Sequence, residues 1–338
     1  MNAKRWQLLG VILLAAAALV PAFVSSRFIL HMFTLIFFYV ALTSAWNIPV
    51  FGGKLSLGHA GFFGLGGYAA AILYVKFGIS PWIGLIVGVM AALAGGAIMT
   101  LPLIRLRGPF FTLASIAFAE ALRMIAIDWR SLTNGSVGLN IPFKPGFANL
   151  TFQSGAPFFY ISLLLAVAVV LIAHKIRFSA LGYHLQASAS NDEAAQALGV
   201  DTKKAHFIAL LWSSGLSGLI GGFYVFFIYV VEPNLMFSLT LFSLQPALNG
   251  IIGGIGTIWG PVVGSVVMTP LGEYLRFYLG TIQQGLNYVV YGVVLIITVN
   301  FIPGGIISLV KPRLLKPAGS TRPAPRAKEA AQHADSVR

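Results

Sequence analysis

Few side chains of this sequence could carry acid–base or ion-binding chemistry, since only 9% of its residues are charged. Two E-x-L-R sequences place Glu120 and Arg123, and Glu273 and Arg276, three residues apart on one helix face. We interpret each as an ion pair near the outer rim of the membrane that neutralises itself, because a proton relay would need more buried acids than this chain has. His59 is the one titratable side chain in its glycine-rich run. It is interpreted either as a structural histidine or as a residue that faces a polar cavity.

The residue types exclude several classes of chemistry. The chain has no cysteine, which excludes disulfides and thiolate metal sites, and its six histidines lack metal-ligand spacing. Lys54 follows glycine but precedes leucine, so the phosphate-binding loop of ATPases is missing. The run 64–69 fits G-x-G-x-x-A, yet no strand precedes it, so a dinucleotide site is excluded. We predict no enzymatic activity, no metal and no cofactor in this chain.

One polar stretch, residues 178–205, lies between two strongly apolar ones. Within it, Ser190 and Glu193 form an S-x-x-E capping box, which predicts a short helix that begins at Ser190. Gly199 is typical of a residue that ends a helix with a positive φ. Such a helix has little core of its own, so we expect an outside partner to hold it; an ordinary solvated loop is the alternative. The residues assigned to this contact are Ser190, Asp192, Glu193, Ala194, Ala195 and Gly199.

The composition is that of a polytopic membrane protein: 57% of the 338 residues are hydrophobic, and the mean hydropathy is +0.85. A membrane helix needs about 20 apolar residues, so the chain can form about ten, and its apolar runs are too long for barrel strands. We therefore predict an all-α fold in the lipid bilayer. The expected spans are 7–25, 28–48, 57–75, 82–104, 109–127, 156–174, 205–230, 239–254, 259–277 and 282–302. Of these, 239–254 is short enough to be re-entrant or broken.

Charge predicts the orientation of the spans. Lys4 and Arg5 precede the first apolar run, as in a signal peptide, but we favour an uncleaved span because further spans follow without a soluble domain. With the N-terminus in the cytoplasm, most of the 22 basic residues lie on the inner side. Both termini and the loop 178–205 are then cytoplasmic, and the loop 129–155 is external.

The same charge pattern bounds the domains and partners. We predict a transmembrane domain at 1–310 and a disordered basic tail at 311–338, whose composition cannot support a core. The net charge of +13 is distributed by topology and is not gathered on one domain, so nucleic acid is not an expected partner.

Two apolar segments are interrupted by glycine, one in each half of the chain. Interrupted helices in both halves are typical of a translocation pathway, whereas regularly spaced glycines are also typical of close helix packing. The residues assigned to the pathway are Ser56, Gly58, His59, Gly61, Gly64 and Tyr68 in the first segment and Asn249, Gly254, Gly256 and Thr257 in the second.

Four motifs occur in an order that resembles one known family. They are S-L-G-H-A-x-F-F-G-x-G-x-Y from Ser56, R-L-R-G from Arg105, E-A-A-x-x-x-G from Glu193 and G-G-x-G-T-x-x-G-P from Gly253. Between about residues 28 and 305 the chain resembles the inner-membrane permeases of branched-chain amino acid ABC importers, and most closely the longer, M-type (LivM-like) subunit. The family's T-G-G-x-x-G pattern in the external loop is changed here, with Asn134 as its second residue.

The resemblance implies a type II-like ABC importer architecture in a bacterial inner membrane. It also implies a second, H-type permease, two cytoplasmic ATPases that bind the ATP and a periplasmic binding protein. ATP-driven closure would push on the helix that ends at Gly199, and rigid-body rocking would open the pathway. Leu, Ile and Val are the expected substrates, with urea, short amides or aromatic acids as alternatives. An ion-coupled secondary transporter and a non-transporting assembly subunit are the other functional classes considered.

Overall fold

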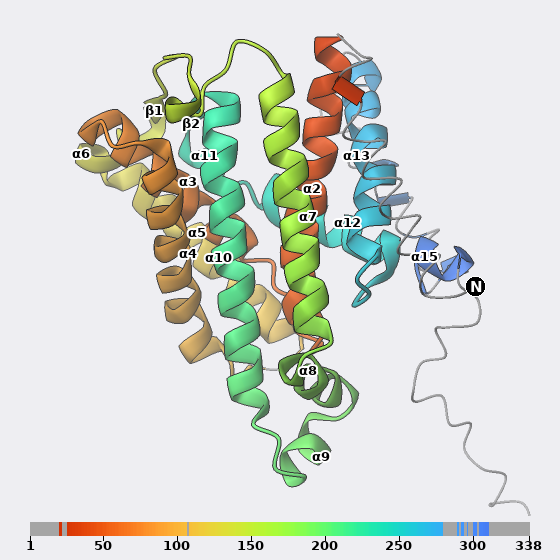
Figure 1. Ribbon diagram of the computed structural model, residues 1–338. Helices are drawn as coiled ribbons and strands as arrows, with labels where there is room; N and C mark the ends of the chain where they lie inside the picture. The colour runs from red at the N-terminus through yellow and green to blue at the C-terminus, as the bar shows by residue number, and fades with distance from the viewer. Residues whose placement is uncertain are drawn as a thin grey trace, which may run out of the picture.

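The computed structural model describes residues 20–21, 26–106, 108–279, 289–290, 292–293, 296, 300–302 and 304–310. Figure 1 shows a bundle of long helices, with a small helical projection at one end and two short strands at the other. The predicted spans 7–25 and 282–302 and the tail 311–338 lie wholly or mostly outside the described residues.

Seven described segments are long and apolar enough to cross a membrane, which confirms a helical, polytopic fold. They are α2 (Arg27–Val50), α3 (His59–Phe77), α4 (Pro81–Leu103), α5 (Pro109–Asp128), α7 (Ala156–Arg177), α10 (Thr202–Ile228) and the compound segment Pro233–Gly254. Another helix, α13 (Gly260–Leu279), covers the predicted span 259–277. The expected number of ten spans is not reached within the residues that the structure describes.

Proline and glycine set several helix ends. α4, α5 and α7 each have proline in the first turn, where the missing N–H breaks no helical hydrogen bond. α3 ends at Gly78, whose φ of 66° is open to glycine without steric cost. These residues separate the apolar runs into distinct helices with short connections.

The core is built where α3, α4 and α10 cross one another. A Cβ at Gly66 of α3 would lie 2.1 Å from the carbonyl oxygen of Gly218 in α10, and a Cβ at Gly221 would lie 2.1 Å from that of Phe63. The two backbones therefore meet through glycine, which is how membrane helices gain close van der Waals contact. The rings of Phe63 and Phe242 stack beside this crossing, with centroids 3.9 Å apart.

The compound segment Pro233–Gly254 is interrupted at Phe237 and Ser238, which lie before the predicted segment 239–254 and not inside it. It comprises α11 (Pro233–Met236), the π-helix η3 (Thr240–Leu244) and α12 (Gln245–Gly254). Residues 239–254 therefore form one continuous helix whose first part is π-helical, and Phe237 and Ser238 separate it from α11.

The connections gather at two opposite ends of the bundle (Figure 1). One end holds α6 (Arg130–Thr133), η1 (Gly135–Val137), β1 (Leu139–Asn140), η2 (Phe147–Asn149) and β2 (Val230–Val231). There β1 and β2 pair antiparallel, with Leu139 opposite Val231. The other end holds α8 (Ala180–Ser190) and α9 (Asp192–Ala197), while α15 (Ile306–Val310) lies beside α12 and α13. The loops 129–155 and 178–205 are thus at opposite ends, as predicted.

Candidate functional site

The short helix expected near Glu193 exists as α9, but its first turn differs from the prediction. Asn191, not Ser190, caps it: the Asn191 side-chain oxygen accepts from the Ala194 N–H at 3.0 Å. Ser190 is the last residue of α8 and donates to the Gln186 carbonyl at 3.1 Å. The capping box is therefore wrong by one residue, because a separate helix α8 runs up to Ser190 and leaves the extended Asn191 as the junction.

The other end of α9 agrees with the prediction. Gly199 has a φ of 85°, in the left-handed region. The Gly199 N–H donates to Gln196 O at 2.9 Å and the Val200 N–H to Ala195 O at 3.0 Å, so both orphan carbonyls are satisfied. A Cβ at Gly199 would meet nothing within 4 Å, so backbone conformation alone selects glycine here.

Most of α9 is uncovered in this chain. Ala195 is its one buried residue and faces the bundle, whereas Glu193 and Ala194 are exposed and Leu198 keeps 86% of its surface exposed. An isolated helix of this length is unstable in water, so its caps and the contact at Ala195 are what hold it. The outer face of α9, with Ala194 and Leu198, is therefore exposed in this chain.

A buried hydrogen-bond network fastens α9 to the bundle. Ser188 of α8 donates to a carboxylate oxygen of Asp192 at 2.8 Å, and its oxygen lies 2.9 Å from Nε2 of His206 in α10. Because the hydroxyl has one proton and an ionised carboxylate only accepts, Nε2–H of His206 must be the donor to Ser188. Gln196 completes the network by donating to the second Asp192 oxygen at 3.0 Å. No local sequence pattern reveals the pairing of Ser188 with His206, because these residues lie 18 positions apart in the chain.

Asp192 has a lowered pKa and lies beside a polar pocket. Burial raises the pKa of Asp192, but hydrogen bonds from Ser188 and Thr202 and the charges of His206 and Lys54 outweigh it, so this pKa lies below its ordinary value. A polar pocket of about 240 Å³ adjoins these groups. Gly52 also lines the pocket, and a Cβ there would lie 2.5 Å from the His206 ring. The loop between α2 and α3 thus meets α9 and α10 at one point.

His59, the titratable residue of the first glycine segment, is fully buried. Its Nε2 lies 2.6 Å from the hydroxyl of Ser213 in α10, and that hydroxyl donates to Ala45 O of α2 at 2.7 Å. The imidazole therefore donates to Ser213, and one hydrogen-bonded chain joins α3, α10 and α2. Ser56 is also buried; its carbonyl accepts from the Trp46 indole at 2.8 Å.

The other residues assigned to the first part of the pathway lie at helix contacts. A Cβ at Gly58 would lie 2.7 Å from Ser115 O, at Gly61 3.1 Å from Ala119 Cα, and at Gly64 2.3 Å from the Phe237 ring. Tyr68 is buried and stacks on Phe237, with centroids 5.7 Å apart. These glycines pack helices in the described chain, and their pathway role stays a prediction.

The second glycine segment forms the turn between α12 and α13. Gly254 and Gly256 have φ values of 134° and 67°, and the Thr257 hydroxyl donates to Gly254 O at 2.7 Å. Asn47 of α2 holds the turn: its amide donates to Thr257 O at 2.7 Å and its oxygen accepts from Gly256 N at 3.1 Å. Asn249 is buried in α12, with its amide 3.4 Å from Ser265 of α13. The two predicted segments are thus held by adjacent residues of α2, Trp46 and Asn47.

Comparison with known proteins decides between the classes considered above. Residues 8–299 match the family described as "Branched-chain amino acid transport system / permease component". The chain belongs to this permease family. It is 24% identical to the high-affinity branched-chain amino acid transport system permease protein LivM of Escherichia coli (strain K12), over 94% of this chain and 78% of that protein. No solved structure matches.

Two further relatives are permeases with other names. A probable branched-chain amino acid transport permease protein LivH of Methanocaldococcus jannaschii is 28% identical, over 72% of this permease and 79% of the relative. The inner membrane ABC transporter permease protein YjfF of Escherichia coli is 24% identical, over 82% and 84% respectively. The permease is therefore similar both to LivM-type and to LivH-type proteins.

The changed motif in the external loop of this permease has a backbone explanation. Asn134 stands where the family pattern has glycine and takes a φ of 66°. Asparagine tolerates this left-handed region better than other residues with a Cβ. Its amide also donates to Gly138 O at 2.8 Å, across the same turn. The substitution therefore preserves the turn that the glycine would make.

The first E-x-L-R pair of the permease is an ion pair, as predicted. Arg123 Nε donates to both carboxylate oxygens of Glu120 at 3.0 Å. Arg123 also donates to Asn234 Oδ1 at 2.6 Å, a partner 111 residues away that the sequence pattern does not reveal. The side chain of Arg276, in the second pair, lies outside the described residues.

Proposed function

We propose that this chain is one permease subunit of an ATP-driven importer for branched-chain amino acids in a bacterial inner membrane. Its partners are a second, H-type permease, two cytoplasmic ATPases that bind the ATP, and a periplasmic binding protein. The observation that carries this proposal is α9, a capped helix at one end of the bundle whose outer face is exposed. Family membership supports it, since the named relatives are branched-chain amino acid permeases.

In this mechanism α9 is the contact with an ATPase. A push on α9 reaches Asp192 and Ser188, and then His206 at the start of α10. Ser213 lies seven residues further along α10, about two turns on and on the same face. It passes the movement to His59 of α3 and to α2 through the hydrogen bonds described above.

The pathway would open by rocking at the two glycine segments. Both are held by α2, and both pack without space for a side chain at several glycines. Such close contacts have few discrete arrangements, so a shift at α9 moves whole helices. The assignment of Ser56, Gly58, His59 and the other segment residues to the pathway remains part of this proposal.

The test is uptake by the reconstituted complex in vesicles that contain ATP, with all ion gradients collapsed. We expect leucine, isoleucine or valine to accumulate at the same rate with and without ionophore. Uptake that needs a gradient would instead identify a secondary transporter. Competition by urea and short amides for the liganded binding protein tests the alternative substrates.

Orientation is tested separately, because the chain has no native cysteine to interfere. Ser136 and Lys203 are both exposed, at opposite ends of the bundle. An impermeant thiol reagent should label Ser136→Cys in intact cells and Lys203→Cys only after permeabilisation. The reverse labelling pattern would place α9 outside the cell and exclude the ATPase contact.

A further inference from the structure

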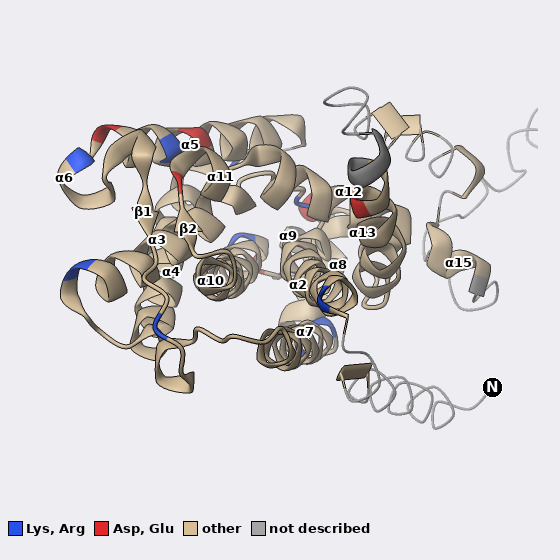
Figure 2. Ribbon diagram, turned by 90° about the horizontal axis from the view of Figure 1, so that it is seen from above, with Lys and Arg blue, Asp and Glu red and all other residues tan. Residues whose placement is uncertain are grey.

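An exposed ion pair lies within the membrane-spanning part of α5. The Glu120 side chain is 49% exposed and that of Arg123 is 21% exposed. Figure 2 shows α5 at the edge of the bundle, with acidic and basic residues on it. Among the seven described spans, Glu120 and Arg123 are the charged residues that lie more than one helical turn from either end.

The depth of Glu120 is inconsistent with a lipid environment. At about 1.5 Å per residue, the 20 residues of α5 extend about 30 Å, and Glu120 lies about 12 Å from the Asp128 end, deeper than the outer rim predicted for this pair. A charged side chain near the middle of a lipid-facing helix costs about 2.5–3.5 kcal/mol by insertion measurements. Charges at such depth therefore face protein or a water-filled cavity.

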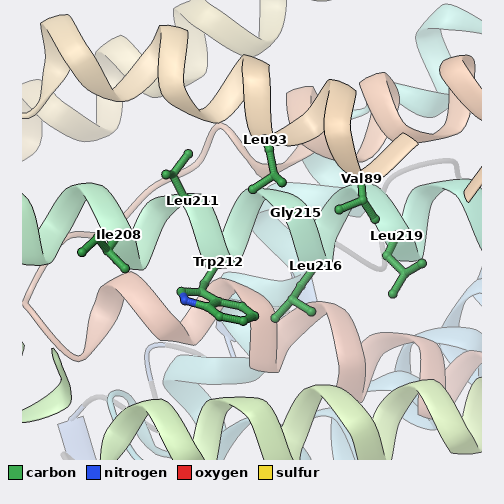
Figure 3. A pocket seen from close by; sticks show the side chains of 8 residues that line it. All are labelled: Val89, Leu93, Ile208, Leu211, Trp212, Gly215, Leu216 and Leu219. Atoms are coloured by element: carbon green, nitrogen blue, oxygen red, sulfur yellow. The ribbon is translucent and has the colours of Figure 1, made fainter. Parts of the chain in front are cut away.

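Another exposed face of the same bundle has the composition expected for lipid. A groove of about 320 Å³ lies between α4 and α10. Its lining is apolar, with Leu93 and Val89 of α4 above Trp212 and Leu216 of α10 in Figure 3. The charged face of α5 thus differs from the apolar face formed by α4 and α10.

Further polar groups converge on the pair from other elements. Arg123 is bonded to Asn234 of α11, whose amide donates to Glu232 at 3.1 Å. Tyr68 of α3 is only 5% exposed, and its hydroxyl has no hydrogen-bond partner among the described residues. The Tyr68 ring stacks on Phe237, which directly follows α11, the helix that begins after Glu232 and contains Asn234. A buried hydroxyl left without a partner needs one, which a bound polar molecule can supply.

We propose that this face of α5, with Glu120, Arg123, Glu232, Asn234 and Tyr68, lines the water-filled pathway and contacts the charged head group of a small amino acid. Two carboxylates and one guanidinium leave a net negative charge, which suits an ammonium group. Arg123 holds Glu120 in place and is a positioning residue. The second permease closes the cavity from the opposite side. This inference rests on the proposed function and specifies its substrate class as zwitterionic, in contrast to neutral urea or amides.

The first test is water access in the assembled, reconstituted complex. Leu113 lies two turns from Glu120 on the same face of α5 and is 62% exposed; Ile98 of α4 is 66% exposed at a similar depth. We expect a charged thiol reagent to modify Leu113→Cys at least about tenfold faster than Ile98→Cys. Equal, slow modification of both would overturn the proposal, because this face would then be covered by lipid or protein.

The second test is Glu120→Gln, compared with Asp128→Asn at the exposed end of the same helix. Loss of one charged hydrogen-bond acceptor should lower leucine uptake by about tenfold or more, while Asp128→Asn stays within about twofold. If wild-type uptake is ATP-driven but Glu120→Gln equals Asp128→Asn, this inference fails and the proposed function stands. If the wild type does not take up amino acids, the proposed function fails. Where Glu120→Gln does not assemble, the two cysteine variants decide.

Discussion

Removing the Ser188 hydroxyl should uncouple ATP hydrolysis from uptake. In Ser188→Ala, Asp192 loses a 2.8 Å hydrogen bond, and Nε2–H of His206 loses its acceptor at 2.9 Å. His206 is only 4% exposed, so most of its ring is out of contact with bulk solvent. Leaving a buried donor unsatisfied costs about 1–3 kcal/mol, which corresponds to a roughly 5- to 150-fold shift toward an α9 detached from α10.

The assay is uptake per ATP hydrolysed, measured on the reconstituted complex with the binding protein saturated by ligand. We expect Ser188→Ala to assemble, to keep its ATPase activity and to transport several-fold less per ATP. Ser162→Ala is the matched control, since the buried Ser162 hydroxyl donates to Phe159 O within α7 and belongs to neither the α9 network nor the assigned ATPase contact. Equal coupling ratios in the two variants would refute the idea that the Ser188 network transmits force.

Three further predictions follow from single sites. Gly199→Val places a β-branched residue at a φ of 85° and should abolish uptake while the amount of protein in the membrane stays normal. Gly199→Asn should retain much of the uptake, because asparagine tolerates this conformation. Equal uptake in both variants would contradict a backbone role for Gly199. Gly66→Ala puts a Cβ 2.1 Å from Gly218 O and should lower thermal stability and assembly more than Gly61→Ala, whose nearest contact is 3.1 Å, as measured by detergent-solubilised Tm. The pKa of Asp192 is lowered in the folded protein. The stability contributed by its ionised carboxylate is therefore fully present above the ordinary pKa near 3.9, and it is lost as the pH falls through the lower pKa of the folded state. Uptake per ATP should accordingly not change between about pH 6 and 8.

Local backbone chemistry is what the sequence predicts well. The left-handed conformation that ends α9 favours glycine, so Gly199 can be recognised from the sequence. The apolar runs from α2 to α10 are long enough to be recognised as membrane spans. The sequence does not determine the first residue of α9, since Ser190 and Asn191 are both good N-caps. Only the extent of α8 decides between them, and that extent depends on packing against α7 and α10.

Partners distant in the chain are what the sequence leaves out. A glycine at position 66 fits a pathway wall as well as a helix crossing until Gly218 is placed against it. Likewise, Glu120 and Arg123 form a complete pair within one helix, so nothing in their spacing points to Asn234. The patterns therefore find the unusual residues, and the three-dimensional contacts decide what each one does.

The hydrogen bonds from α2 to both glycine segments limit how that helix can move. Trp46 and Asn47 are consecutive, so their side chains leave the helix axis about 100° apart. One holds the segment before α3 and the other holds the turn before α13. Because these two hydrogen-bonding side chains point in different directions, α2 cannot rotate about its own axis relative to both segments without breaking one set of hydrogen bonds. Any transport cycle that keeps both hydrogen bonds must therefore carry α2, the start of α3 and the start of α13 as one piece.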